Sequence, residues 1–413
     1  MEDTSLISMK KILLRGAMAA FAAIACCVPA SARDINLDGI YLKATSPYQT
    51  KLLLGKLDAW FAVGARLLDR EVVFAGWMSG AEIAYVKEDA GTGENLVCVY
   101  RVPENRYSVA VRVKGDVMHA AVSPSGRYMV MKRLIRRGDI IPEGEIVVVA
   151  LPGGEQTVLA TGNPLPDYTV SPDGNSLYLE TEGGIDEYRM TGGARRRVLG
   201  RSACPEAFRK TSPTLAFSSP DRGRWVVLSG GGGLYTACLH GASAQRSVRG
   251  ITSSMELCWL GNTAFAFRSG GVGDHSVVEY RVRDGSTRMV GGGSLNTSMS
   301  YSPHAGILSW LLDGLIMLYY PAQGRKVTTG LEGEDVFFDP AGSRFTALVG
   351  RRLFLADLHS LRSRGIELKR AQEHLLSLYR ELSRLPGEGS NEFSREYIGR
   401  KIRLYRELLR EKH

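Results

Sequence analysis

Several chemistries need residue patterns that this 413-residue sequence does not contain. It has no GxSxG nucleophile elbow, no HExxH zinc-binding pair and no Walker phosphate loop. Its six cysteines include no CxxC pair, which argues against zinc knuckles and thioredoxin-like redox chemistry. Motifs therefore assign no catalytic residue, no cofactor-binding residue and no metal ligand, and we expect no cofactor.

Two segments approach ligand-binding patterns without completing them. Residues 229–233 are Ser-Gly-Gly-Gly-Gly, but they lie between two apolar runs and no helix follows, so we interpret them as a hairpin loop. Residues 34–39 begin like a calcium loop. Leu42 and Thr45 occupy its ninth and twelfth positions, where later ligands belong. We interpret this segment as a polar linker.

No apolar run makes a good membrane span, and the N-terminal run has other features. Lys10-Lys11 and Arg15 precede a small-residue apolar stretch over residues 16–28, and Ala30-Ser31-Ala32 suits a signal peptidase. We predict a signal peptide over residues 1–32, cleaved before Arg33, and a periplasmic location. An N-terminal membrane anchor is the alternative interpretation.

A lipid anchor is a further alternative at the same segment. Ala23-Ile24-Ala25-Cys26 resembles a bacterial lipobox, although its first residue is smaller than usual. Cys26 is therefore a candidate lipidation residue, and its acylation would convert a soluble exported protein into a membrane-anchored lipoprotein.

Glycine is abundant, with 47 residues, and it recurs in a repeated turn that precedes an apolar run. Five copies contain proline: Ser123-Pro124-Ser125-Gly126, Ser171-Pro172-Asp173-Gly174, Ser219-Pro220-Asp221, Ser302-Pro303-His304-Ala305-Gly306 and Asp339-Pro340-Ala341-Gly342. Two weaker copies begin at Trp77 and Trp259, and successive copies lie 37 to 48 residues apart. Proline presets φ, Asp or Ser bonds back to the backbone, and glycine accepts positive φ, so the chain reverses tightly.

Further apolar runs and turns follow each copy, and Asp313-Gly314 joins two of these runs as a predicted hairpin. Several strands per unit at this period indicate an all-β propeller of about seven blades over residues 71–357. The seventh unit has no fourth strand of its own. We expect residues 39–42 or 60–63, within the N-terminal segment 33–70, to close the ring. The alternative is a helix over about residues 50–68, packed against one face.

The Ser-Pro-Asp-Gly turns resemble the WD40-like repeats of TolB-type periplasmic propellers, over roughly residues 70–357. The most typical copy is Ser171-Pro172-Asp173-Gly174. The resemblance implies a binding platform for other envelope proteins. It departs from that family in the predicted seven blades, in having no separate α/β domain before the ring, and in its appended helices.

Residues 358–413 are predicted to form a basic helical hairpin. A heptad pattern places apolar residues on one seam of the first helix: Leu368, Ala371, Leu375, Leu378, Leu382 and Leu385. Pro386-Gly387 ends that helix, and a second apolar stripe follows: Phe393, Tyr397, Ile398, Ile402, Tyr405, Leu408 and Leu409. The hairpin could pack on its own propeller, serve as an exposed docking helix or dimerising coiled coil, or contact an anionic membrane surface.

Four cysteines follow the predicted signal peptide: Cys98, Cys204, Cys238 and Cys258. An oxidising compartment permits disulfides between them. Cys98 lies in a run that predicts a buried strand, which favours a buried free thiol. A bridge from Cys238 to Cys204 or to Cys258 would join neighbouring blades, and the sequence leaves both pairings open.

The formal net charge is +9, and residues 361–413 contribute 13 Lys or Arg against 8 Glu. This balance favours acidic partners or anionic surfaces. Lys132-Arg133, Arg136-Arg137 and Arg195-Arg196-Arg197 raise nucleic-acid binding as a hypothesis. The export signal argues against it, and basic residues also protect outer strands from pairing, so we expect no nucleic-acid partner.

Five of the seven histidines lie in predicted loops and turns without metal-ligand spacing: His119, His240, His275, His304 and His359. Equivalent propeller loops meet at one mouth of the ring, so several of these histidines could converge there. We therefore predict a non-catalytic scaffold or protein-binding propeller in the bacterial periplasm, with envelope proteins as partners. The alternative is a lactonase-like propeller hydrolase with a site at the channel mouth.

Overall fold

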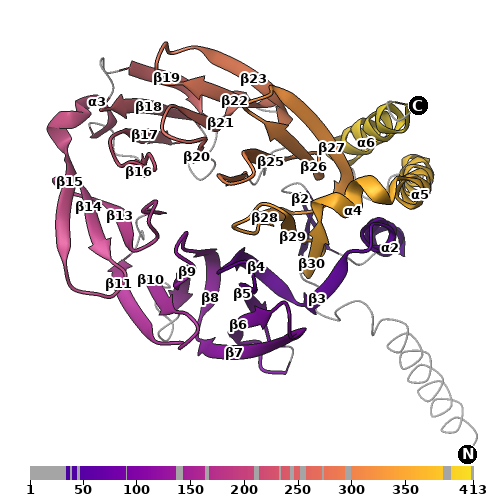
Figure 1. The fold of residues 1–413 in the computed structure, drawn as a ribbon, viewed down its shortest axis with the longest axis horizontal. Helices are drawn as coiled ribbons and strands as arrows, with labels where there is room; N and C mark the ends of the chain where they lie inside the picture. The colour runs from indigo at the N-terminus through magenta and orange to yellow at the C-terminus, as the bar shows by residue number, and fades with distance from the viewer. Residues whose placement is uncertain are drawn as a thin grey trace, which may run out of the picture.

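The computed structural model of the chain is a seven-bladed β-propeller with a group of helices at its rim (Figure 1). It describes residues 34–37, 40–43, 47–89, 91–135, 143–162, 167–208, 214–231, 234–241, 246–251, 257–271, 274–293, 299–384 and 392–410. The predicted fold class, a propeller with a C-terminal pair of helices, is confirmed. The predicted signal peptide and Cys26 lie outside these described residues.

Six blades take four consecutive antiparallel strands each, with the first strand innermost. Blade 1 comprises β4 (Val72–Trp77), β5 (Glu82–Glu88), β6 (Asn95–Arg101) and β7 (Arg106–Val113). Blade 2 comprises β8 (Asp116–Val122), β9 (Tyr128–Ile135), β10 (Glu143–Ala150) and β11 (Gln156–Gly162). Blade 3 comprises β12 (Tyr168–Val170), β13 (Ser176–Thr181), β14 (Gly184–Arg189) and β15 (Arg195–Gly200).

Blades 4 and 5 form one continuous sheet, because Ile251 pairs with Ser269 across their boundary. Blade 4 comprises β16 (Thr214–Ser218), β17 (Trp225–Gly231), β18 (Leu234–His240) and β19 (Arg246–Ile251). Blade 5 comprises β20 (Leu257–Trp259), β21 (Ala264–Gly271), β22 (Asp274–Arg281) and β23 (Thr287–Gly293). Blade 6 comprises β24 (Ser300–Ser302), β25 (Ile307–Leu312), β26 (Leu315–Tyr320) and β27 (Arg325–Glu332).

All seven predicted turn signals lie between the first and second strands of a blade. In blade 3, the Ser171 hydroxyl accepts the Ser176 N–H at 2.9 Å and donates to Asp173 at 2.6 Å. Gly174 has φ +67, and a Cβ there would lie 2.3 Å from the backbone nitrogen of Ser125 in the preceding blade's turn. Glycine is therefore needed twice, for its conformation and for close packing between neighbouring turns. The predicted Asp313-Gly314 hairpin is also present, with positive φ at both residues.

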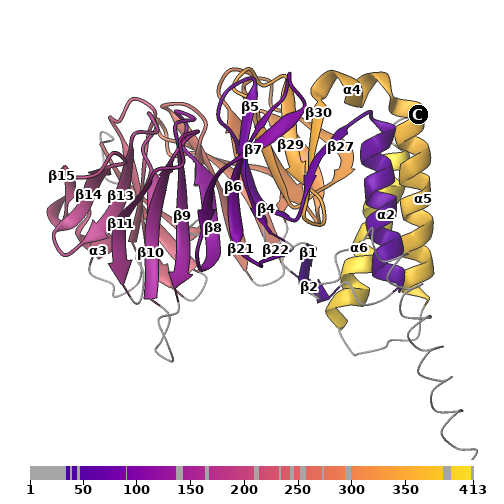
Figure 2. The ribbon, with the colours of Figure 1, turned by 90° about the horizontal axis from the view of Figure 1, so that it is seen from below.

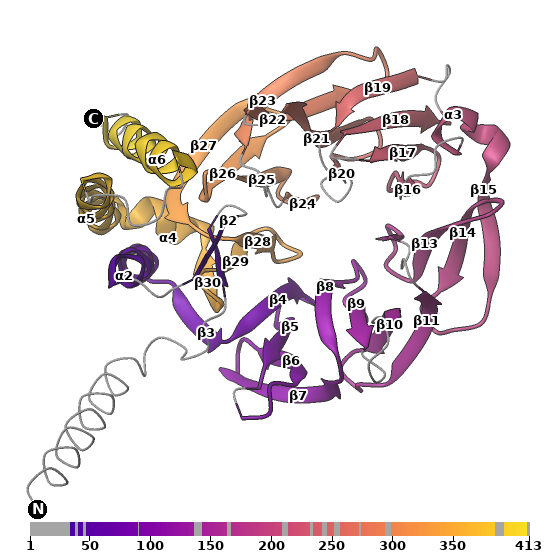
Figure 3. The same cartoon turned by 180° about the vertical axis from the view of Figure 1, so that it is seen from behind.

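Blade 7 is completed by a strand from the other end of the propeller, as predicted, but by different residues. Its strands are β28 (Asp335–Phe338), β29 (Arg344–Leu348), β30 (Arg352–Asp357) and β3 (Arg66–Arg70). β3 pairs with β30 in antiparallel register, with Arg66 opposite Leu355. The two strands lie side by side in Figure 3. Residues 60–63 were the wrong choice because 60–62 end a helix. Residues 40–43 belong to a separate two-stranded sheet instead.

The N-terminal helix is α2 (Pro47–Ala62), so the expected helix is present over residues 50–62, but it packs at the rim beside other helices and not against one face of the ring. Before it, β1 (Asp34–Leu37) pairs with β2 (Ile40–Lys43), where a polar linker was expected. A short 3-10 helix, η1 (Arg201–Ala203), and α3 (Pro205–Phe208) connect blades 3 and 4. After β30 follow α4 (Leu358–Ser363), α5 (Gly365–Ser383) and α6 (Glu392–Arg410). No helix among the described residues combines the length and apolarity that a membrane span requires.

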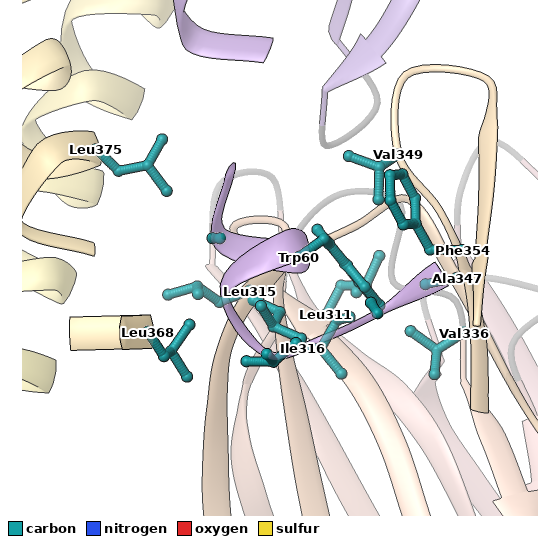
Figure 4. Packing of buried hydrophobic residues seen from close by; sticks show 14 of the residues in the cluster. Trp60, Leu311, Leu315, Ile316, Val336, Ala347, Val349, Phe354, Leu368 and Leu375 are labelled. Atoms are coloured by element: carbon teal, nitrogen blue, oxygen red, sulfur yellow. The ribbon is translucent and has the colours of Figure 1, made fainter. Parts of the chain in front are cut away.

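Helices α2, α5 and α6 stand side by side at the rim, next to blades 6 and 7 (Figure 2). We call these three helices the helical layer. Their apolar faces join the sheets in one core (Figure 4). Trp60 lies at its centre, with its ring 5.8 Å from Phe345 and 5.4 Å from Phe354. The heptad residues Leu368 and Leu375 are fully buried there. The hairpin thus packs on its own propeller, which was one of the predicted alternatives.

Candidate functional site

One candidate site lies on the inner strands of blades 1 to 3, where two aromatic rings contact a histidine. His119 on β8 contacts the ring of Phe74 on β4, and its Nδ1 lies 2.8 Å from the Tyr168 hydroxyl on β12. Lys132 on β9 and Asp167, just before β12, form an ion pair of 2.6 Å beside them. We call these five residues the inner-strand cluster.

The electrostatics of the inner-strand cluster keep its histidine neutral. Burial lowers the pKa of His119, the nearby Lys132 ammonium lowers it further, and Asp167 only partly opposes them. Burial, with a smaller contribution from Asp167, raises the pKa of Tyr168. At neutral pH, His119 and Tyr168 are therefore uncharged hydrogen-bonding groups beside one partly exposed ion pair.

The other histidines named above come from other elements, and no contact between this cluster and the described side chains of His240, His304 and His359 is present. His240 ends β18, His275 lies on β22, His304 lies in the turn after β24, and His359 lies on α4. The predicted convergence of several histidines is therefore not seen. Across the residues that the structure describes, no three His, Cys, Asp or Glu side chains are grouped to hold a metal ion.

A second polar group lies where the helical layer meets blade 6, and motif analysis missed it. Glu332, the last residue of β27, is fully buried and accepts hydrogen bonds from the hydroxyls of Tyr379 and Tyr405. Its carboxylate also contacts the ammonium groups of Lys56 at 2.8 Å and Lys401 at 3.0 Å. We call these five residues the Glu332 junction.

The Glu332 junction connects every helix of the layer to the sheet. Lys56 comes from α2, Tyr379 from α5, and Tyr405 and Lys401 from α6. Burial alone would raise the pKa of Glu332, but the two lysines and the hydrogen bonds lower it to about 2. The carboxylate therefore stays ionised, and its charge holds the three helices in fixed positions. A glutamate at the end of a polar outer strand gives no motif by which sequence analysis could find it.

Three large apolar side chains of α2 and α5 are exposed, and we call them the outward surface of the helical layer. Leu54 and Phe61 on α2 are 48% and 50% exposed, and Ile366 at the start of α5 is 71% exposed. Leu54 and Phe61 lie seven residues apart, which places them on one face of the helix. A Cβ at Gly64 would touch Arg364, so the end of α2 carrying Phe61 lies beside the end of α5 carrying Ile366.

The arginine run that suggested nucleic-acid binding lies on β15, an outer strand, and its charges are paired within blade 3. Arg195 and Arg197 both contact the buried Asp186 carboxylate, and Arg196 contacts Glu187 at 2.6 Å. Lys132 and Arg133 pair with Asp167 and Glu145. Arg136-Arg137 and residues 232–233 of the glycine-rich segment lie outside the described residues.

The structure brings together one of the two cysteine pairs that the sequence left open. The Cys238 sulfur lies 2.6 Å from the Cys204 sulfur, and both residues are buried. Cys98 is buried in blade 1, as predicted. Cys258 lies on β20 in the next blade, where its sulfur contacts the carbonyl of Trp259.

Among the comparisons with known proteins, only the comparison with solved structures found similar proteins. No family model and no curated protein matches the sequence. The chain is similar to an oligogalacturonate lyase from Vibrio parahaemolyticus (10% identity, 72% of this chain and 92% of that chain, TM-score 0.48). It is also similar to an uncharacterized protein from Listeria monocytogenes (9%, 69% and 91%, TM-score 0.47) and to TolB from Acinetobacter baumannii (15%, 67% and 64%, TM-score 0.40). At these values the similarities carry no argument about function, which must come from this chain's own residues.

Proposed function

We propose that the chain is a protein-binding scaffold of the bacterial envelope that contacts its partner through the outward surface of the helical layer. The observation that carries this proposal is the exposure of Leu54, Phe61 and Ile366 on helices whose opposite faces are buried. Single exposed apolar residues are common. Two of them on one face of α2, with a third on the neighbouring helix, favour a protein contact here.

The charge of the helices favours a partner with acidic groups around its apolar contact. Residues 361–413 carry 13 basic and 8 acidic side chains, a net charge of +5. Such a surplus speeds association with an acidic surface and orients it, while burial of apolar side chains supplies most of the affinity. The Glu332 junction supports this role, because it fixes the layer before binding and so reduces the ordering cost.

The envelope location is part of the proposal and rests on the sequence. The basic start, small-residue apolar stretch and Ala30-Ser31-Ala32 support export, and Cys26 supports a lipid anchor. An anchored scaffold would meet its partners at the membrane surface.

The test compares two double variants of the full chain in crosslinked envelopes. Leu54→Asp with Ile366→Asp places charges on the proposed contact. Val158→Asp with Met289→Asp places equal charges on exposed outer-strand positions of blades 2 and 5. Phe61 is left unchanged because its ring packs on Phe354 at 5.5 Å.

We expect the first variant to lose crosslinked envelope proteins that wild type and the second variant both retain. Equal capture by both variants would move the contact away from the helices. If the wild-type chain captures no protein, the scaffold hypothesis is wrong and the inner-strand cluster becomes the leading site.

The inner-strand cluster supports one second candidate, a propeller hydrolase with its site at the channel mouth. A neutral histidine hydrogen-bonded to a tyrosine hydroxyl can act as a general base. Turnover of a lactone or ester by the full chain that His119→Ala abolishes and His240→Ala leaves intact would favour this candidate over the scaffold.

A further inference from the structure

Two cysteine sulfurs meet at the connection between blades 3 and 4. Cys204 lies between η1 and α3, and Cys238 lies on β18, the third strand of blade 4. Their sulfur atoms are 2.6 Å apart, so a covalent bond of about 2.05 Å needs a shift of only about half an ångström. The chain segments that carry them are already packed together, since α3 contacts both β17 and β18.

We propose that Cys204 and Cys238 are a disulfide-forming site that fastens the connection between the two blades to the body of blade 4. The surroundings favour a structural bridge over a reactive thiol pair. Cys204 is fully buried and Cys238 is 8% exposed, inside an apolar cluster that includes Leu199, Phe208 and Trp225. A bridge sealed in such a cluster is shielded from thiol reductants once the protein has folded.

The bond forms by thiol–disulfide exchange with an external disulfide oxidant. One cysteine loses its proton, and its sulfur attacks the oxidant to give a mixed disulfide and one released thiol. The second cysteine then loses its proton, and its sulfur attacks the mixed disulfide and releases the second thiol. Two protein thiols and one oxidant disulfide thus become one protein disulfide and two small thiols. Because the native cluster excludes solvent, we expect this exchange during folding, before the cluster closes.

The two remaining cysteines provide internal controls. In the folded protein, burial raises the pKa of the Cys98 thiol to about 11 and that of the Cys258 thiol to about 12, so neither is an effective nucleophile at neutral pH once folding is complete. They lie in blades 1 and 5, on β6 and β20. The inference is independent of the partner surface proposed above, because it concerns only the interior of the propeller.

The bridge would reduce the conformational freedom of the unfolded chain. It would close a loop of 35 residues, from 204 to 238 inclusive, that contains the first two strands of blade 4 and part of the third. For a loop of this length in a chain of this size, we expect the bridge to raise the unfolding midpoint by about 5 °C.

The experiment refolds the full chain in a mixture of reduced and oxidised glutathione, then blocks accessible thiols in denaturant and maps the peptides without reduction. We expect a peptide pair joined through Cys204 and Cys238, and alkylation of Cys98 and Cys258. Refolding with a thiol reductant, so that the bridge does not form, should lower the unfolding midpoint of wild type and of Cys98→Ala/Cys258→Ala, but not that of Cys204→Ala/Cys238→Ala.

Alkylation of both Cys204 and Cys238 after refolding with the oxidant would overturn the proposal. A peptide pair joined through Cys238 and Cys258 would overturn it equally. Mapping uses only the wild-type chain, so it decides the question even if the Cys204→Ala/Cys238→Ala variant does not fold.

Discussion

The Glu332 junction and the inner-strand cluster use the same chemical groups in different surroundings. Each has a carboxylate paired with lysine and at least one tyrosine hydroxyl. The Glu332 and Lys401 side chains are fully buried, whereas those of Lys132 and Asp167 are each 25% exposed. Burial makes the first group part of the structural core, while the ion pair of the second group keeps contact with solvent. Residue identity alone therefore does not separate a structural ion pair from a candidate site.

Replacing the junction carboxylate should have the largest effect. Glu332→Gln leaves Lys56 and Lys401 buried beside a neutral amide, and we expect a loss of about 3–5 kcal/mol in the free energy of unfolding. Urea unfolding measures this change. Glu373→Gln, an exposed position on α5, is the matched control and should change stability by less than about 0.5 kcal/mol. Equal losses of unfolding free energy from the two substitutions would show that the buried contacts of Glu332 do not stabilise the fold.

Lowering the pH should remove most of the difference in unfolding free energy between wild type and Glu332→Gln. The pKa of Glu332 falls from 4.5 in the unfolded chain to about 2 in the folded protein, so its contribution is complete above about pH 4.5 and is lost towards pH 2. The gap in unfolding free energy between wild type and Glu332→Gln should therefore narrow by about 3 kcal/mol between pH 5 and pH 2. A gap that stays constant over this range would show that folding does not lower the pKa of Glu332.

The equivalent substitution in the inner-strand cluster should cost much less. Lys132→Met breaks the pair with Asp167. Because both side chains of this pair are partly exposed to water in the wild type, we expect a loss below about 1 kcal/mol in the free energy of unfolding. Measured beside Lys401→Met under the same conditions, it tests whether burial sets the difference between the groups. A loss from Lys132→Met as large as that from Lys401→Met would contradict this view.

The smallest effect on stability should come from replacing His119. The pKa of His119 lies below its ordinary value in the folded protein because of burial and Lys132. The unfolded chain therefore takes up the proton first as pH falls, and stability declines below about pH 6.5. His119→Gln should flatten this slope between pH 8 and pH 5.5 in thermal unfolding. An unchanged slope would show that His119 titrates as it does in the unfolded chain.

The repeated turns were predictable because their chemistry is local. Serine, proline, aspartate and glycine determine a chain reversal within a few residues, so seven copies of the turn are enough to predict seven blades. The closing strand was not predictable in the same way. Arg66–Arg70 carries charge at both ends, as an outer strand should, whereas residues 60–62 of the more apolar run 60–63 end a helix that buries Trp60.

The candidate sites depend on contacts between distant segments, which no local pattern encodes. Glu332 meets residues from positions 56, 379, 401 and 405, and His119 meets Tyr168 across two blades. The sequence offered both cysteine pairings of Cys238, and only packing between α3 and β18 distinguishes them. Hydrophobic periodicity was more informative for α5 and α6, since it marked the faces that turned out to be buried.

The closure of blade 7 determines how the molecule would respond to mechanical force. β3 and β30 are antiparallel, so the chain segments leading to the two termini leave this strand pair from the same end, beside Arg66 and Leu355. Tension between the termini would therefore peel the strands apart one hydrogen-bonded pair at a time, which is the weakest geometry for a sheet. α2 and α5 pack against each other just beyond that end and would have to separate first. The contact between α2 and α5 thus protects the pairing of β3 with β30 in blade 7 from tension applied at the termini.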